Sequence, residues 1–138
     1  MKKLLAMALL VCVCLSIVAC GIAKDPADLK KKMEDKDYEV LFSDKELEVK
    51  GYLTMLGLPT DGATAIVTAG KEEDDEEKAI VVIYYEDAKA AGEAYDKLQE
   101  NLDKIFENVD EDAKDDYKTG KSGTAIYFGH KDAIKDAK

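Results

Sequence analysis

The sequence predicts an α+β domain built on one antiparallel sheet. One observation is the run Ala79–Tyr85, which is apolar throughout and does not alternate. Such a run is typical of a central strand that is covered on both faces. The other is residues 88–109, where apolar side chains recur at alternating spacings of three and four. That period is the signature of an amphipathic helix. Strands and helices are therefore mixed along one chain.

The elements before the central strand are predicted from local signals. A helix is expected at 26–36, because Asp25 can accept hydrogen bonds from free N–H groups and Pro26 suits the first helical turn. A strand follows at 38–42, where β-favouring residues partly alternate. Another strand is expected at 63–69.

Segment 44–57 allows two interpretations. Ser43 and Glu46 have capping-box spacing, which favours a helix that ends at Gly57. Its apolar side would carry Leu47, Tyr52, Leu53 and Leu56. The alternative is a strand in which Leu47, Val49, Leu53 and Met55 alternate. We expect the helix, although Gly51 weakens it.

The second half begins with an acidic segment, 71–78, which is expected to be a solvated turn before the strand 79–85. The helix at 88–109 could form a coiled-coil seam, but docking on its own sheet is the expected arrangement. Residues 110–122 are polar and acidic and predict a loop. A strand at 124–128 and a short closing helix end the chain, and the apolar residues of that helix are Ala133, Ile134 and Ala137.

From residue 38 onward the elements follow the order βαββαβ. This is the ferredoxin-like order, here with an added helix at each end. The two main helices would cover one sheet face. The other face would be either an open contact surface or buried under the terminal helices. One alternation places on it Thr64, Ile66, Thr68, Ile80, Val82, Tyr84, Ala125 and Tyr127.

The N-terminus has the layout of an export signal. Lys2 and Lys3 precede an apolar run, 4–19, that only Ser16 interrupts. The run is shorter than the ~20 residues that cross a bilayer as a helix, so a permanent span is the weaker interpretation. An ordinary secretory signal ending near a cysteine is the alternative to the specific motif at its end.

That motif is Ile17-Val18-Ala19-Cys20. It resembles the lipobox of bacterial lipoprotein precursors. The resemblance implies diacylglyceryl attachment to the Cys20 sulfur and cleavage between Ala19 and Cys20. The precursor is similar in general form to small Gram-positive lipoproteins without an assigned activity. The resemblance implies a location at the cell membrane, on its extracytoplasmic face. The expected division is a signal peptide at 1–19, a lipidated terminus and short tether at 20–24, and one α+β domain at 25–138.

Charge limits the possible partners of the domain. The formal net charge is −10, and every basic residue is a lysine. Nucleic-acid binding needs a cationic footprint, so no nucleic-acid partner is expected. The membrane, reached through the lipid anchor, and an envelope protein are the expected partners. No cofactor is expected.

The candidates for chemistry are few. His130 is the only histidine and follows a predicted strand, which suits a structural residue at a strand-to-helix junction. Asp110, Asp112 and Asp116 have calcium-ligand spacing. A calcium loop needs glycine at its sixth position and glutamate at its twelfth, where this chain has Asp115 and Lys121. We therefore expect no catalytic residue and no metal ligand.

Three functions remain open. The first is a non-enzymatic binding or interaction domain that a lipid anchors outside the membrane. The second is a divalent-cation-binding lipoprotein that uses its acidic loops. The third is a hydrolase that uses carboxylates, which would need a deep pocket with converging Asp or Glu side chains.

Overall fold

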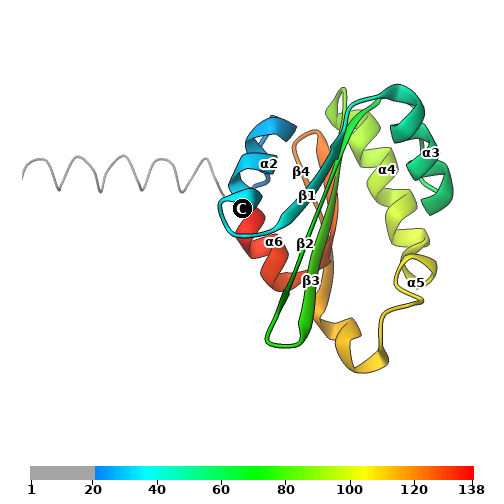
Figure 1. The fold of residues 1–138 in the computed structure, drawn as a ribbon. Helices are drawn as coiled ribbons and strands as arrows, with labels where there is room; N and C mark the ends of the chain where they lie inside the picture. The colour runs from blue at the N-terminus through cyan, green and yellow to red at the C-terminus, as the bar shows by residue number, and fades with distance from the viewer. Residues whose placement is uncertain (1–20) are drawn as a thin grey trace, which may run out of the picture.

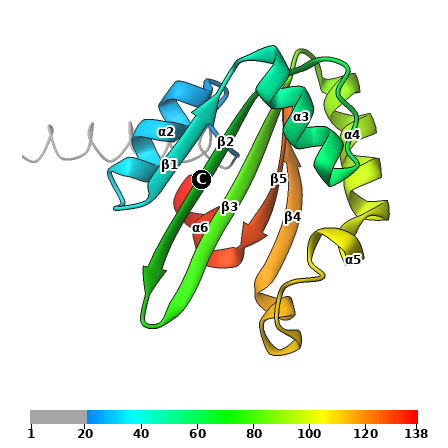
Figure 2. The ribbon, with the colours of Figure 1, turned by 45° about the vertical axis from the view of Figure 1, so that its right-hand side comes forward.

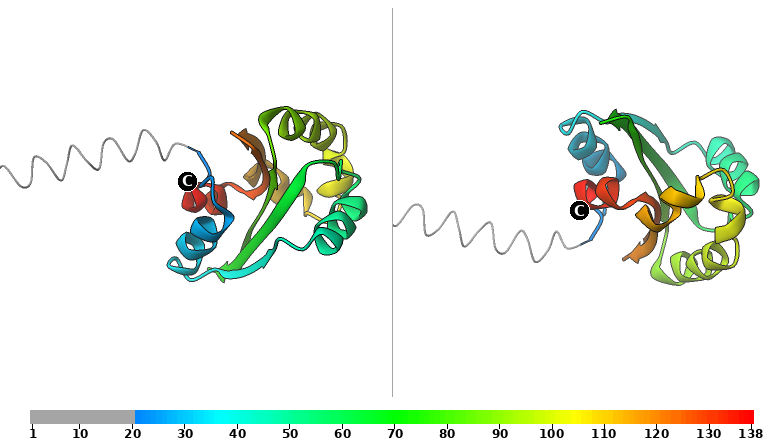
Figure 3. Two further views of the ribbon diagram at one scale, coloured as in Figure 1. Left: turned by 90° about the horizontal axis from the view of Figure 1, so that it is seen from above. Right: turned by 90° about the horizontal axis from the view of Figure 1, so that it is seen from below.

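The computed structural model describes residues 21–138 (Figure 1). A five-stranded antiparallel sheet lies between two layers of helices, and the predicted α+β class is confirmed. Figure 3 shows the layers from above and below, with α2 and α6 on one side of the sheet and α3 and α4 on the other. The elements in chain order are α2 (Pro26–Glu34), β1 (Glu39–Ser43), α3 (Glu46–Leu56), β2 (Ala63–Glu73), β3 (Glu76–Tyr85), α4 (Ala88–Glu100), α5 (Leu102–Ile105), the 3₁₀ helix η1 (Glu111–Asp116), β4 (Tyr117–Ser122), β5 (Ala125–His130) and α6 (Lys131–Ala137).

The strand order is β1-β2-β3-β5-β4, with every neighbouring pair antiparallel. The ferredoxin-like order is therefore not confirmed. That order would place the first strand inside the sheet next to the third, whereas here β1 pairs with β2 and lies at the edge. β3 occupies the centre, and its residues Ile80 and Val82–Tyr85 are buried, as predicted for the apolar run.

Two cores fill the space between the layers. On the α2/α6 side, Leu29 and Met33 of α2 and Ile134 of α6 pack on Val67 and Val82 of the sheet. On the α3/α4 side, buried residues of the two helices pack on the alternate residues of the same strands. These residues are Val49, Leu53, Ala91, Leu98, Ile66, Ile83, Ile126 and Phe128.

Of the two alternatives for the second sheet face, this packing bears out burial under the terminal helices and not an open contact surface. The terminal helices bury the face that carries Val82 and Tyr84, whose exposed fractions are 0% and 2%. The residues predicted to share this face come in fact from two faces, because Val67 rather than Ile66 lies opposite Val82. A shift of one residue along β2 moves every side chain to the other face, and the local pattern did not determine that choice.

The helix ends follow the predicted chemistry in part. Asp25 caps α2, where its Oδ1 accepts from the Ala27 N–H at 2.9 Å. Segment 46–56 is a helix, as favoured, and Gly57 ends it in the left-handed region at φ +71°. The capping box does not form, however, because Lys45 occupies the N-cap position. Leu47 was expected on the apolar side but is 87% exposed.

Three boundaries differ from the predictions. β2 and β3 extend through the acidic segment, and the turn consists of Asp74 and Asp75 alone, both with positive φ. The helix expected at 88–109 is interrupted at Asn101, whose side-chain amide donates to the Gly57 carbonyl at 2.9 Å. The loop expected at 110–122 contains η1 and an edge strand, β4. The helix α4 itself docks on the sheet through Ala91 and Leu98, as expected.

Candidate functional site

The α3/α4 face of the sheet is only partly covered. Figure 2 shows that α3 and α4 lie over its upper part, while the end of the β2–β3 hairpin extends below them. Here an open pocket of about 750 Å³, called the acidic pocket below, lies over strands β1 to β3. The residues that line it are Asp37, Glu39, Leu41, Thr68, Ala69, Gly70, Lys71, Glu72, Glu77 and Ala79.

Strand alternation explains the negative charge of this pocket. Glu72 and Glu77 are register partners, and they share a face with the partners Gly70 and Ala79. Lys71 and Lys78 are also partners, one position away, so they belong to the opposite face. There the Lys71 Nζ lies 3.2 Å from a Glu73 carboxylate oxygen. The Lys71 ammonium group is thus directed away from the glutamates, although Lys71 itself is among the residues that line the pocket.

A smaller apolar pocket of about 150 Å³ adjoins the acidic one and shares Ala79 with it. Its walls come from three aromatic rings. Phe106 lies 5.5 Å from Tyr117 and 6.2 Å from Phe128, measured between ring centroids. Ile105 and Val109 complete the lining on the side of α5. An acidic surface and an apolar recess therefore lie next to each other on one face.

The edge strand beside the acidic pocket carries exposed apolar side chains. Leu41 is 75% exposed and Phe42 is 37% exposed. Within residues 21–138, β1 pairs with β2 alone, so the backbone groups on its other edge have no strand partner there. An edge of this kind can accept an added extended segment.

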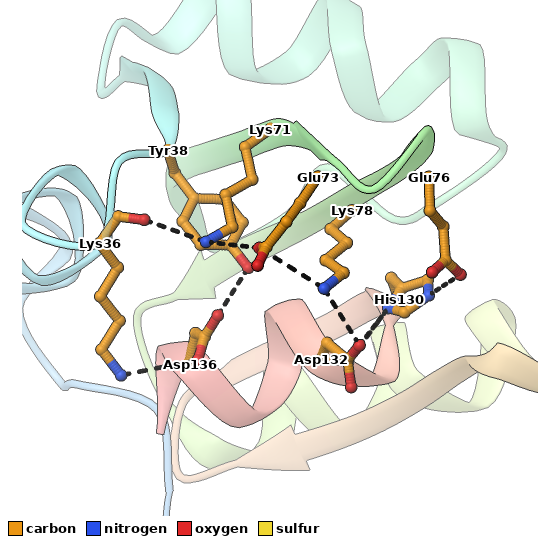
Figure 4. A network of polar contacts seen from close by, with 9 residues as sticks. All are labelled: Lys36, Tyr38, Lys71, Glu73, Glu76, Lys78, His130, Asp132 and Asp136. Carbon is orange, nitrogen blue, oxygen red and sulfur yellow. Dashed lines mark hydrogen bonds and ion pairs between the residues drawn. The ribbon is translucent and has the colours of Figure 1, made fainter.

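The other face of the hairpin carries a network of ion pairs and hydrogen bonds (Figure 4). Lys78 Nζ lies 3.5 Å from Glu73 and 3.4 Å from Asp132 of α6. The Tyr38 hydroxyl donates to Asp136 at 2.8 Å. Burial, together with this hydrogen bond, raises the pKa of Tyr38. The network therefore ties α6 to the β2–β3 hairpin.

His130 lies at the end of β5 and is almost fully buried, with 1% of its surface exposed. Its Nδ1 accepts from the Asp132 N–H at 3.1 Å, so the ring proton is on Nε2, which donates to Glu76 Oε1 at 2.8 Å. His130 is also the N-cap residue of α6. The expected strand-to-helix junction is confirmed, and both ring nitrogens have partners.

The predicted site residues are distributed unevenly. Ala19 and Cys20 lie outside the described residues. Asp110 and Asp112 are exposed at the start of η1, and Asp116 ends it. Sequence reasoning missed Glu76, which it placed within a solvated turn. The pair Asp74-Asp75 could have indicated Glu76, because aspartate tolerates the positive φ that a two-residue hairpin turn requires. With the turn confined to that pair, the glutamates on either side belong to the strands.

The N-terminal segment is packed onto the domain. Ile22 is buried in the core under α2 and α6, and its N–H donates to Ser122 Oγ at 3.0 Å. The Tyr84 hydroxyl donates to the Ala23 carbonyl at 2.7 Å, and burial raises the pKa of Tyr84. Among the described residues, the packed region thus includes Ile22, which precedes the expected start of the domain at Asp25.

None of the helices within residues 21–138 combines the length and the apolar character that crossing a bilayer requires. Comparison with protein-family models, curated proteins and solved structures found no match to this chain.

Proposed function

We propose that this chain is a bacterial lipoprotein, anchored to the extracytoplasmic face of the cell membrane, whose domain binds a basic segment of an envelope protein without catalysis. The observation that carries the anchor is the tetrapeptide Ile17-Val18-Ala19-Cys20 at the end of an apolar run that follows two lysines. One fatty chain holds a protein only marginally, and two or more make a stable anchor, so a diacylglyceryl cysteine is sufficient.

The packed N-terminal segment supports an orientation for the domain. Ile22 belongs to the core on the α2/α6 side, two residues after the proposed lipid attachment. The acidic pocket lies on the other face of the sheet. We infer that the α2/α6 layer faces the bilayer and that the acidic pocket faces away from it, toward the envelope.

The chemistry of the acidic pocket selects its occupant. Four carboxylates, those of Asp37, Glu39, Glu72 and Glu77, line it and favour a cationic partner. The free edge of β1 and the exposed Leu41 suit an extended backbone with apolar side chains. The apolar pocket can hold one such side chain. An extended segment that alternates basic and apolar residues satisfies all three features.

Mass spectrometry of the chain purified from membranes tests the anchor. We expect a mature N-terminus at Cys20 with added acyl mass. Cys20→Ser should remove that mass and shift the protein to the soluble fraction. Cys14→Ser is the matched control and should change neither result, because residue 14 leaves with the signal peptide. A Cys20→Ser chain that still partitions with membranes would contradict the proposal.

A labelled peptide of alternating lysine and leucine tests the pocket, with binding followed by fluorescence anisotropy. The double variant Glu72→Gln, Glu77→Gln should weaken binding about 2- to 30-fold, since each exposed ion pair contributes about 0.2–1 kcal/mol. Glu93→Gln with Asp96→Asn removes the same charge from α4 and should have little effect. Equal weakening by both pairs would indicate attraction to net charge alone, against a defined pocket.

The hydrolase hypothesis stays a prediction. It requires that one of the pocket carboxylates act on a bound substrate. Turnover of a peptide or ester substrate that Glu72→Gln or Glu77→Gln abolishes would favour it over binding alone.

A further inference from the structure

Two acidic segments and the single histidine meet at one place in the fold. Glu76 begins β3 just after the acidic turn, Asp116 ends η1, and His130 ends β5. One possible ligand atom from each residue lies within 4.8 Å of the other two. The pairing of β5 with both β3 and β4 produces this arrangement, because it brings three segments that are distant in sequence to one end of the sheet.

We propose that Glu76, Asp116 and His130 bind a divalent transition-metal ion of the zinc type. One imidazole nitrogen and two carboxylate oxygens are a ligand set that Zn²⁺ accepts. Tetrahedral bonds of about 2.0–2.2 Å place ligand atoms roughly 3.3 Å apart. The most widely separated of the three atoms must therefore approach by up to about 1.5 Å, whereas His130 Nε2 and Glu76 Oε1, now 2.8 Å apart, must separate by about 0.5 Å. Three protein ligands also leave one coordination position open for water or another small ligand.

The three proposed ligands differ in exposure, and the two exposed carboxylates have room to rearrange around an ion. The His130 side chain is 2% exposed and is held by its neighbours, whereas the Glu76 side chain is 49% exposed and that of Asp116 is 32% exposed. The histidine therefore provides a fixed nitrogen, and the two carboxylates can move toward the ion from the solvent side. Their exposure also provides an entry path for the ion.

Asp132 can orient the histidine in the metal-bound form. Coordination through Nε2 requires the ring proton to move to Nδ1, which changes the tautomer without any net gain or loss of protons. The Asp132 Oδ2 lies 3.9 Å from Nδ1 and can then accept that proton in a hydrogen bond. Metal-bound histidines commonly donate their other ring N–H to a carboxylate in this way. In exchange, Nδ1 no longer accepts from the Asp132 N–H.

Lys131 competes with the ion for one ligand. Its Nζ lies 3.0 Å from Asp116 Oδ1, and its side chain is 56% exposed. A bound cation must either displace this ammonium group or share the carboxylate with it. Removing the Lys131 charge should therefore tighten metal binding, which is the opposite of what a general loss of structure would do.

Calorimetric titration of the detergent-solubilised full chain with Zn²⁺ tests the site. The background should carry Cys12→Ser, Cys14→Ser and Cys20→Ser, which removes every thiol of the chain. We expect one saturable site per chain. Loss of a group that hydrogen-bonds a metal ligand typically costs about 10- to 100-fold in affinity, and Asp132→Asn should fall within that range. Glu76→Gln and Asp116→Asn each remove a ligand and should weaken binding more than that. Lys131→Gln should bind Zn²⁺ more tightly than the background.

The matched controls are Glu77→Gln, next to Glu76 in β3, and Asp112→Asn, in η1 with Asp116. Both should retain the affinity of the background. Because Glu76 and Asp116 are partly exposed, their variants should keep the metal-free unfolding temperature, and this measurement separates lost binding from lost folding. Absence of a one-to-one site, or equal affinity in the site and control variants, would overturn the proposal.

Discussion

Gly129 is the position where the sheet is least able to accept a side chain. A Cβ built on Gly129 would lie 2.3 Å from the Ala79 carbonyl oxygen and 2.7 Å from the Ile80 Cα. Contacts of a real Cβ are essentially never shorter than 3.0 Å, so β5 and β3 would have to separate by about 0.7 Å. Both obstructing atoms belong to the backbone of the central strand and cannot rotate away.

Gly129→Ala should therefore cost the upper end of the range for overpacking, about 3 kcal/mol. Roughly 120 packed residues have an unfolding entropy of about 0.25 kcal/mol per kelvin, so Tm should fall by about 12 °C. Gly51→Ala is the matched control in α3, because among the described residues no neighbour that could obstruct a Cβ lies within 4 Å. It should raise stability by about 0.5–1 kcal/mol, the usual gain in a helix interior.

The assay is thermal and urea unfolding followed by circular dichroism. The reasoning is refuted if Gly129→Ala stays within about 1 kcal/mol of the parent chain, since the strands would then part without loss of packing. It is also refuted if Gly51→Ala destabilises as much as Gly129→Ala does. In that case the effect would come from any added methyl group and not from the contact between β5 and β3.

Three further predictions concern the N-terminus, the surface and alkaline pH. Ile22→Ala should lower the free energy of unfolding by about 2 kcal/mol in urea titrations, because the residue is buried in the core; no change would mean that the segment is not docked. Leu47→Ser should change stability by less than about 0.5 kcal/mol, because the side chain is exposed, and a larger loss would reveal a contact. Burial raises the pKa of Tyr84 and Tyr85, so the folded state holds these hydroxyls protonated while the unfolded chain ionises near pH 10.0. The stability they provide is complete below that pH and is lost as pH rises above it; urea midpoints that stay flat from pH 8 to 11 would contradict this.

Elements with strong local signals could be predicted from the sequence. Asp25 and Pro26 mark the start of α2 within one turn, and the structure uses both as expected. The central position of β3 followed from its lack of alternation, because only a strand covered on both faces needs apolar residues at every position. These features depend on residues close together in the chain.

The strand β4 and the strand order depend on distant residues. The residues Tyr117–Ser122 are mostly polar, and they form a strand because β5 offers its hydrogen-bonding edge along their whole length. β1 lies at the sheet edge, whereas the expected ferredoxin-like order would have placed it inside the sheet. Local propensity does not predict which strands pair, because the stability of a residue in a sheet depends on its contacts with the neighbouring strands.

The candidate sites could not be predicted from the sequence, because they too depend on residues that are distant in the chain. Asp116 and the acidic turn were each recognised and each assigned to solvent, and His130 was assigned to a junction. The junction is confirmed, whereas most of the acidic segment lies in β2 and β3, and Asp116 is half-buried beside Lys131. The convergence of the three appears only when the β3–β5 and β4–β5 pairings are known. Lipid attachment at Cys20, in contrast, was predicted from four adjacent residues and remains a prediction.

The acidic hairpin connects the two proposed sites through its register. The turn at Asp74 and Asp75 sets Glu73 opposite Glu76 and Glu72 opposite Glu77. Because side chains alternate between faces, the first pair faces α6 and the histidine, and the second pair faces the acidic pocket. A turn longer by one residue would break this division, since one strand would slip and exchange its faces. The short turn thus allows one run of acidic residues to contribute to the proposed metal site on one side and to the proposed peptide-binding pocket on the other.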